Sequence, residues 1–468
     1  MLEILMLIMT ERQASLGSRS IFSGRALFCL FWSGLAVFPF AEYTFRMGKS
    51  LLGLVSIPAL ATFFLVGREL AASTGTPIGS ASLSPEVIRY FSPAEFARGQ
   101  AYADGLYWLA AVGIALRLGL LLLLVFTPAS AALRSLALRW SRGHSVLATA
   151  LYLSLLVIGY ELLILPLRYY AGFVREHAFQ LSTQTQADWF SDWGKGCLLL
   201  LGLTVPLGSV LVTLWRRTPK RWALWAWAGC GGLTVALVAL APLIIDPLFN
   251  TIRPLEDPVL RQRVLALAER AGLSVDQVYV SDASRRTTAE NAYFTGLGAT
   301  KRVVLYDTLL RHNDPAAVAT VVGHELGHWR HGDIWKGIGW SLLGLAICFW
   351  CAAHVLAWAG RGRRFHLTGP ADMAAVPLVL LVVFVLNLVS LPLQNAISRR
   401  MERAADRTAL ELTRDPAAFI RSEVQLARAG LADLAPPRAV VFLLYTHPPT
   451  LDRIRMAEAF AAKLGAPQ

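Results

Sequence analysis

The chain has 468 residues, of which 55% are hydrophobic and 16% are charged, whereas soluble proteins carry charge at about a quarter of their positions. Long stretches without charge argue against an ordinary soluble protein and indicate an integral membrane protein. The net charge of +13 lies in short loops between apolar segments, with no arginine stripe among exposed aromatic residues, so it predicts membrane topology and argues against a nucleic-acid partner.

Seven apolar segments are long enough to cross a membrane as helices. Five come before residue 246, and two follow a single long polar stretch. The shorter apolar run Ala26–Phe40 extends the first span, lies at the membrane interface or forms an eighth span. The N-terminal sequence MLEILMLIMTERQ is not expected to be a secretory signal, because its apolar part is short, is interrupted by acid and follows no basic residues. The predicted spans lie near Leu51–Val66, Tyr107–Thr127, Leu147–Leu167, Gly196–Trp215, Trp222–Ile245, Trp335–Trp358 and Ala374–Gln394.

Two charged residues inside these spans, Arg117 and Glu161, would be costly in lipid and are expected to face the interior of the helix bundle. There they either pair with each other or line an internal chamber. The alternative is that the side chains snorkel towards the interface, or that a span edge is misplaced.

The spans divide the chain into four parts. The first polar part begins with a predicted helix over Asp257–Ala271. Three β-rich runs follow, and the sequence GLGA predicts a turn between the last two, so we expect a small antiparallel sheet. The runs are Gln277–Ser281, Ala292–Thr295 and Arg302–Tyr306. The four parts are residues 1–245 with about five spans, 246–334 as the soluble part with the polar motif helix, 335–397 with two further spans, and 398–468 as the C-terminal soluble part.

A cluster of polar residues stands out in VVGHELGHWRHGD, Val321–Asp333, near the end of a predicted helix over Pro315–His331. Asn313 or Asp314 can cap this helix, the proline suits its first turn, and Gly332 is a natural stop. The cluster therefore lies where a soluble helix meets the next membrane span.

Two histidines of the cluster, His324 and His328, are four residues apart and share one face of the helix. They can present two imidazoles to one metal ion. Glu325 then projects beside that ion, where it can act as a base for a water molecule, as in the H-E-x-x-H motif of zinc peptidases. A chance match in a polar turn is the alternative. The predicted helix without an internal proline favours zinc.

Catalytic zinc needs a third protein ligand, and a second acidic helix, Asn395–Asp406, directly follows the last span. Its Glu402 and Asp406 are four residues apart, so one can bind zinc while the other accepts a hydrogen bond from a ligand histidine. An exposed helix with charge pairs is the alternative. Because the last two spans run out and back, Glu402 must return to the side of the membrane that holds His328.

Six motifs, taken in order, resemble those of the type I CAAX prenyl proteases. These are multi-span zinc peptidases that include the a-factor-converting enzyme. The resemblance covers nearly the whole chain, because the number of spans agrees and the motifs fill the polar parts. The motifs are PLFNTIRPL (Pro247–Leu255), ENAYFTG (Glu290–Gly296), KRVVLYDTLL (Lys301–Leu310), HELGH (His324–His328), NAISRRMERAAD (Asn395–Asp406) and THPPTLDRI (Thr446–Ile454).

The resemblance implies a mainly α integral membrane protein in which a ring of seven transmembrane helices encloses a chamber. A zinc peptidase domain with a small antiparallel β-sheet would cap one end of the ring. The resemblance also implies one zinc ion per chain, with Glu402 as the third ligand, and a peptide or protein substrate, with or without a lipid. Asn291, Ala292 and Tyr293 would lie on an edge strand that pairs with the substrate backbone. The chain is expected to be a monomer in the lipid bilayer.

Residues of the last motif are expected to complete the site. His447 would donate a hydrogen bond to the oxyanion that develops during hydrolysis, orient a carboxylate, or lie in a structural loop with prolines. Arg453 would anchor the tail by pairing with an acid such as Asp406. In the histidine motif, His331 is expected to point away from the metal and Asp333 only to end the helix. The predicted catalytic residues are Glu325 and His447.

Some features leave alternatives open. Family members often carry a histidine where this chain has Ala289, so substrate contact at that point is in question. A heat-shock membrane protease shares the H-E-x-x-H motif but has fewer spans, which argues against such a quality-control function here. A transporter or receptor with a structural zinc ion is the other alternative. Glu325 argues against it, since a structural site needs no base.

The basic loops Arg134–Arg142, Arg216–Arg221 and Arg361–Arg364 share one side of a seven-span protein, opposite the zinc domain. The positive-inside rule makes these loops cytoplasmic and places the site outside the cytoplasm. Eukaryotic family members place this domain in the cytosol, so the rule and the resemblance conflict. The alanine- and arginine-rich composition indicates a bacterial inner membrane, which favours a periplasmic site and makes prenylated substrates less expected.

Overall fold

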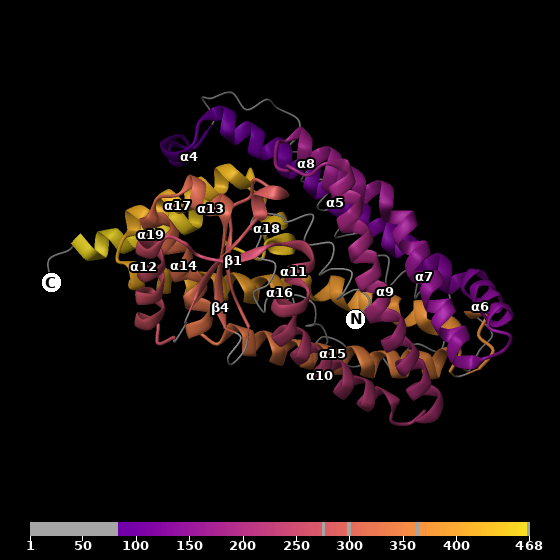
Figure 1. The fold of residues 1–468 in the computed structure, drawn as a ribbon. Helices are drawn as coiled ribbons and strands as arrows, with labels where there is room; N and C mark the ends of the chain where they lie inside the picture. The colour runs from indigo at the N-terminus through magenta and orange to yellow at the C-terminus, as the bar shows by residue number, and fades with distance from the viewer. Residues whose placement is uncertain (1–82, 274–276, 297–300, 361–364, 370, 466–468) are drawn as a thin grey trace, which may run out of the picture.

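The computed structural model of the chain describes residues 83–273, 277–296, 301–360, 365–369 and 371–465. The apolar run Ala26–Phe40, the first predicted span Leu51–Val66 and the basic loop Arg361–Arg364 lie outside the described residues. The described part is mainly helical and elongated, with the sheet towards one end and the membrane helices extending towards the other (Figure 1).

The other six predicted spans each fall, to within one residue, inside a helix that is long and apolar enough to cross a membrane. The described residues therefore contain six of the seven expected spans. Local sequence sets the helix starts: Ser92 and Glu95 form a capping box at the first of them, and the Thr185 side chain caps the third. The six helices are α5 Pro93–Phe126, α7 Ser145–Tyr169 continued by the π-helical turn Tyr170–Val174 and α8 Arg175–Ala178, α9 Gln186–Arg217, α10 Trp222–Ile244, α15 Asp333–Ala359 and α16 Val376–Thr413.

The sheet has four strands in the order β1-β2-β4-β3. The three predicted runs are strands, but the expectation of an antiparallel sheet is wrong, because β2 and β4 are parallel. Val303, Val304 and Leu305 of β4 are fully buried, and a strand that is apolar on both faces belongs in the middle of a sheet. The strands are β1 Ile252–Pro254, β2 Val278–Ser281, β3 Ala292–Thr295 and β4 Arg302–Tyr306.

Two helices, α12 Pro258–Arg270 and α14 Pro315–Arg330, pack with the sheet in one apolar core. Val264 and Leu267 of α12 and Val322 and Leu326 of α14 are buried in that core. Three C-terminal helices, α17 Pro416–Gly430, α18 Arg438–Leu444 and α19 Thr450–Gly465, lie at the same end of the molecule (Figure 1). The short elements are α4 Pro85–Tyr90, α6 Ala129–Trp140, α11 Asp246–Phe249, η4 Ala283–Arg285, α13 Asp307–His312 and η7 Met373–Ala375.

The two described basic loops, Arg134–Arg142 and Arg216–Arg221, lie at the far end of the bundle from the sheet. Arg134 of α6 pairs with Asp372, and the Arg216 guanidinium at the end of α9 donates to the Ala371 carbonyl. Residues 371–372, which precede α16, therefore contact both α6 and the end of α9. Figure 1 shows α6 at the opposite end of the molecule from α12, α14 and α19.

Candidate metal centre

The sequence around α14 determines both of its ends. The Asp314 carboxylate accepts hydrogen bonds from the backbone N–H groups of Ala316 and Ala317, and proline occupies the first turn. His331 caps the C-terminus, and Gly332 follows with φ 65°, a left-handed conformation that suits glycine. The helix ends one residue earlier than predicted and carries the histidine motif in its last turns.

Two glycines bring α14 against α16. A Cβ atom on Gly327 would lie 2.9 Å from the Cα and carbonyl O atoms of Ala405, and one on Gly323 would lie 3.2 Å from Ala409 Cα. Only glycine permits this approach of the two backbones. The predicted acidic helix is not separate, because it continues the last membrane span within α16. This continuity places Glu402 opposite the histidines of α14.

Three predicted ligands converge between the two helices. One ligand atom from each of His324, His328 and Glu402 lies within 4.8 Å of the others, and all three residues are buried. Glu402 Oε2 is 3.3 Å from His324 Nε2 and 3.9 Å from His328 Nε2. Glu325 is also buried and follows His324 in the chain, but it is not among the converging side chains.

Each histidine contacts a carboxylate through its other ring nitrogen. His324 Nδ1 is 2.6 Å from Asp406 Oδ1, and His328 Nδ1 is 2.8 Å from Asp333 Oδ2. An ionised carboxylate only accepts hydrogen bonds, so each Nδ1 carries the proton and each Nε2 keeps a lone pair. The two Nε2 atoms are 3.0 Å apart. Two lone pairs this close repel each other unless a proton or a metal ion lies between them, so the neutral pair of rings fits a metal ion.

Charge around the cluster also favours a cation. Burial lowers the pKa of His324, but Asp406 and Glu402 raise it further, to about 9. A site that holds a proton on imidazole this strongly has a negative potential. Two nitrogens and one carboxylate oxygen are a donor set that zinc accepts, with a fourth position left for water or substrate.

A buried ion-pair network supports the Asp406 carboxylate. Arg453 of α19 donates to both oxygens of Asp406, at 2.9 and 2.5 Å, and also pairs with Glu423 of α17 at 2.6 Å. Burial raises the pKa of Glu423, which Arg453 opposes, to about 7. The tail is thus tied to the ligand helix through three charged residues. The sequence prediction included the Arg453–Asp406 pair but not Glu423.

Two other histidines differ in their distance from the cluster. His447 Nε2 is 3.2 Å from Glu402 Oε2, and His447 Nδ1 is 2.9 Å from the Thr446 hydroxyl. His447 therefore contacts the predicted ligand set. His331 Nε2 lies 3.0 Å from the Thr408 hydroxyl instead and takes no part in the cluster.

The edge strand β3 offers only some of its backbone to a partner. The Tyr306 N–H donates to the Asn291 carbonyl, so these two residues are a hydrogen-bonded pair of the antiparallel strands. Hydrogen-bonded and non-hydrogen-bonded pairs alternate along such strands. In this register Ala292↔Leu305 is therefore a non-hydrogen-bonded pair and Tyr293↔Val304 is a hydrogen-bonded pair. Tyr293 then pairs with β4, whereas the N–H and C=O groups of Ala292 and Phe294 point to the other side. In the part of the chain that the structure describes, no strand pairs with that side. Of the three predicted residues, only Ala292 directs its backbone groups outward.

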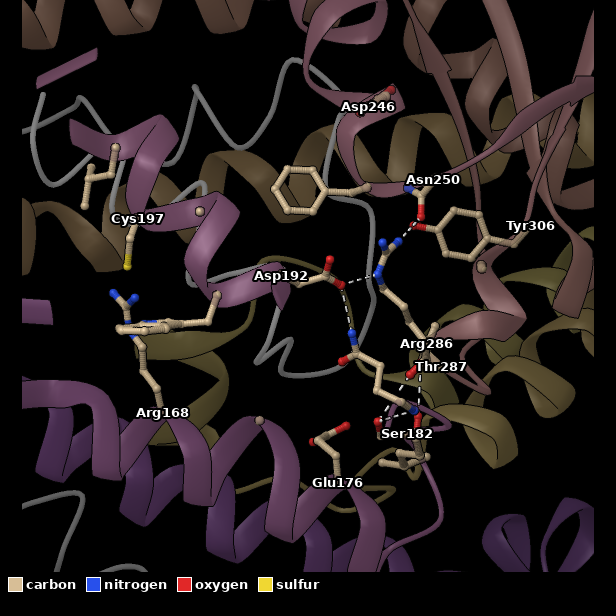
Figure 2. A pocket seen from close by; sticks show the side chains of 18 of the residues that line it. Arg168, Glu176, Ser182, Asp192, Cys197, Asp246, Asn250, Arg286, Thr287 and Tyr306 are labelled. Carbon is tan, nitrogen blue, oxygen red and sulfur yellow. Dashed lines mark hydrogen bonds and ion pairs between the residues drawn. The ribbon is translucent and has the colours of Figure 1, made fainter. Parts of the chain in front are cut away.

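A cavity of about 170 Å³, lined by several charged side chains, lies between the membrane helices and the sheet. Tyr293 and Tyr306 line it from the sheet, and Asp246, from the start of α11, accepts a hydrogen bond from the Tyr293 hydroxyl at 3.2 Å. Figure 2 shows the Arg286 guanidinium directed to Asp192 and Asn250 across this space. The cavity reaches the strand that carries the predicted substrate contacts.

Glu161 lines this cavity, but its partner is not the one considered from the sequence. Arg168 Nη1, two turns along the same helix, is 2.5 Å from Glu161 Oε2. Arg117 lies on α5 and does not pair with it. The predicted span Leu147–Leu167 ended one residue before Arg168. Arg168 was therefore placed outside the membrane helix and was not considered as a partner of Glu161.

Asp333 is the site residue whose role the sequence reasoning got wrong. We expected it only to end the helix, yet its carboxylate contacts His328. In an unbroken helix a residue five positions after His328 would point away from it. The left-handed conformation of Gly332 turns the chain so that Asp333 faces His328. In the sequence, this glycine was the only indication of such a turn.

Comparison with known proteins gives consistent matches. Residues 79–251 match the family model described as CAAX prenyl protease N-terminal, five membrane helices, and residues 254–461 match the model of peptidase family M48. An uncharacterized metalloprotease of Bacillus subtilis is 31% identical over 405 residues, which are 85% of this chain and 93% of that protein.

Other matches include a eukaryotic enzyme and a crystal structure. CAAX prenyl protease 1 of Saccharomyces cerevisiae is 32% identical over 215 residues, which are 46% of this chain and 48% of the yeast protein. The crystal structure of S. mikatae Ste24p matches with a TM-score of 0.76 and 24% identity, covering 87% of this chain and 98% of that one. This last likeness shows a shared fold.

Proposed function

The chain belongs to peptidase family M48, and from this membership we propose that it hydrolyses peptide bonds with one zinc ion held by His324, His328 and Glu402. It is a membrane metalloendopeptidase that resembles the CAAX prenyl proteases. The observation that carries the proposal is the buried convergence of two imidazole Nε2 atoms and a carboxylate oxygen, with both Nδ1 atoms already bonded to carboxylates. Zinc peptidases use this donor set.

The proposed chemistry divides the work among residues of the site. When bound, zinc acts as a Lewis acid that polarises the scissile carbonyl and makes water more acidic. Glu325 accepts the proton of the attacking water and passes it to the leaving amine. His447, whose Nε2 is near Glu402, donates a hydrogen bond to the oxyanion. Asp406 holds His324 in orientation, and Arg453 holds Asp406.

We propose that the substrate backbone adds to β3 as an extended strand. The outward N–H and C=O groups of Ala292 and Phe294 would supply the hydrogen bonds, since those of Tyr293 are paired with β4. Side chains on the Tyr293 face of such a strand would point towards the cavity that Tyr293 and Tyr306 line. This arrangement suits a peptide or an unfolded protein segment, with or without a lipid, and does not restrict the sequence further.

The active site is proposed to face the periplasm of a bacterial inner membrane. The contacts of Arg134 and Arg216 with the segment at residues 371–372 support this, because they gather basic residues at the end of the bundle opposite the sheet. Positively charged ends stay in the cytoplasm. A reporter fused to the C-terminus of the full chain tests the side: alkaline phosphatase should be active and a cytoplasmic fluorescent protein dark. The reverse pattern would place the site in the cytoplasm.

Metal analysis and cleavage together test the function. Purified full-length protein in detergent should contain one zinc ion per chain and cleave an unstructured reporter peptide. A chelator should stop cleavage, and added zinc should restore it. Cleavage that continues in a metal-free sample would contradict zinc catalysis and favour a different nucleophile.

A pair of variants in α16 tests the third ligand. Glu402→Ala should lose zinc, because it removes one of three protein ligands. Glu411→Ala removes an exposed carboxylate from the same helix and should keep zinc and activity. Equal zinc content in the two variants would show that Glu402 is not a ligand.

A further inference from the structure

Asp333 joins a membrane helix to a predicted metal ligand. It is the first residue of α15, and its Oδ2 atom is 2.8 Å from His328 Nδ1, with both side chains buried. Its other oxygen, Oδ1, accepts a hydrogen bond from the half-exposed Lys336 ammonium at 3.0 Å. The two oxygens therefore have different partners, one of them inside the site.

The turn at Gly332 makes this contact possible. Five residues along an unbroken helix correspond to a rotation of about 500°, which would place Asp333 far from the face of His328. Gly332 instead adopts φ 65°, and the chain starts a new helix whose first side chain reaches back to α14. The position of this carboxylate is thus set by the junction between the soluble helix and the membrane helix.

The two histidines then have matched partners from different helices. Asp406 of α16 accepts from His324, and Asp333 of α15 accepts from His328. A carboxylate at Nδ1 holds the proton there, leaves the Nε2 lone pair for a metal and fixes the plane of the ring.

We propose that Asp333 is a positioning residue that fixes the tautomer and orientation of His328 for metal binding. This rests on the proposed function, since it assumes that His328 is a ligand. By this contact the start of α15 also becomes part of the metal site, so that the membrane helix and the ligand move together.

A different role for Asp333 would be purely structural. An acid in the first turn of a helix interacts favourably with the helix dipole wherever the helix lies. Asp188 occupies the same kind of position in membrane helix α9, where it is exposed and bonds to Thr185. Asp188→Asn is therefore a matched control that removes an acid from a helix start and leaves the metal site intact.

The test uses full-length protein in detergent, stripped of metal, as wild type, Asp333→Asn, Asp333→Ala and Asp188→Asn. Zinc affinity is measured by competition with a chromophoric chelator, and the visible absorption spectrum is recorded with Co²⁺ in place of zinc. Asp333→Ala should weaken zinc binding about 10- to 100-fold. Asp333→Asn keeps an acceptor for Nδ1–H, so it should recover part of the affinity, while its altered charge shifts the Co²⁺ bands. Asp188→Asn should match wild type in both.

The outcomes separate the inference from the proposed function. If both Asp333 variants bind zinc within about twofold of wild type and give its Co²⁺ spectrum, the inference is wrong and the zinc site stands. Should Asp333→Ala fail to fold, Asp333→Asn decides by the same two readouts. A shift of equal size in Asp188→Asn would assign the effect to the helix start and overturn the positioning role. Wild-type protein that binds no zinc would overturn the proposed function and this inference with it.

Discussion

Substitution of Gly327 by alanine perturbs the site without touching a ligand. The added Cβ would lie 2.9 Å from the Cα and carbonyl O of Ala405, whereas ordinary contacts begin at 3.4 Å. Both close atoms belong to the backbone, so a side-chain rotation cannot relieve the overlap. We expect α14 and α16 to separate locally by about 0.5 Å, which moves Glu402, one turn from Ala405, away from His324 and His328.

The size of the effect follows from two opposing contributions. Overpacking of this kind costs about 1–3 kcal/mol, and alanine in place of glycine inside a helix returns about 0.5–1 kcal/mol. The free energy of unfolding should therefore fall by about 1 kcal/mol. A displacement of about 1 Å costs roughly a hundredfold in rate, so half that displacement should lower kcat/KM about tenfold.

Two controls distinguish displacement from loss of stability. Gly339→Ala adds a Cβ on α15 that meets no atom within 4 Å, and it should leave activity and stability near wild type. Val264→Ala removes buried methyl groups from α12 and should lower stability by a similar amount with little loss of rate. Unfolding in detergent, zinc affinity and peptide cleavage are measured for each. Equal zinc affinity and cleavage in Gly327→Ala and Gly339→Ala would refute the idea that glycine packing positions Glu402.

Three further predictions concern the metal, the ion-pair network and pH. Removal of zinc from wild type should lower the unfolding temperature, because zinc at a hundred times its Kd stabilises the folded state by about 2.7 kcal/mol. The unfolding temperature of Glu402→Ala should not respond to zinc. A wild type that responds no more than this variant would contradict the ligand set. Arg453→Gln should lower the free energy of unfolding by about 3–5 kcal/mol, since it leaves Asp406 and Glu423 buried without their cation. Glu423→Gln should lower that free energy much less. Similar losses of stability in the two variants would contradict the proposed role of Arg453. Burial raises the pKa of Glu290, and this effect outweighs the contacts with Gln425, Asn313 and His312, which lower it. The Glu290 carboxyl therefore binds its proton more tightly in the folded state than in the unfolded state. Stability from this group should be greatest below pH 4.5 and decline as pH rises through the raised value, and Glu290→Gln should flatten that slope in unfolding measured from pH 4 to 7.

Much of the fold could be predicted because membrane spans and helix ends have local signals. The six described spans depend on runs of apolar residues, and α14 begins where Asp314 and Pro315 predict it. Two i, i+4 spacings indicated the pairs His324–His328 and Glu402–Asp406, and spans that run out and back brought the pairs to one side, whereas the choice of Glu402 as third ligand came from the family resemblance. These are properties of single helices, which a sequence displays directly.

The errors came from pairings between distant segments and from turns. Strand β4 inserts between β2 and β3 because it is apolar on both faces, and no local pattern specifies the parallel partner. The contact of Asp333 with His328 depends on the φ of Gly332, which a glycine permits but does not require. Glu423 reaches Arg453 only through the packing of α17 against α19, which the sequence spacing does not encode.

Glu325 is proposed to act as the base of a zinc peptidase, and the variant Glu325→Gln is the sharpest test of this role. Wild type and variant are purified as full-length proteins in detergent, their zinc content is measured, and cleavage of the same reporter peptide is followed. We expect equal zinc content and a loss of about 10²- to 10⁴-fold in kcat, since glutamine keeps the shape but cannot accept the proton. A Glu325→Gln protein that holds zinc and cleaves as fast as wild type would contradict this role.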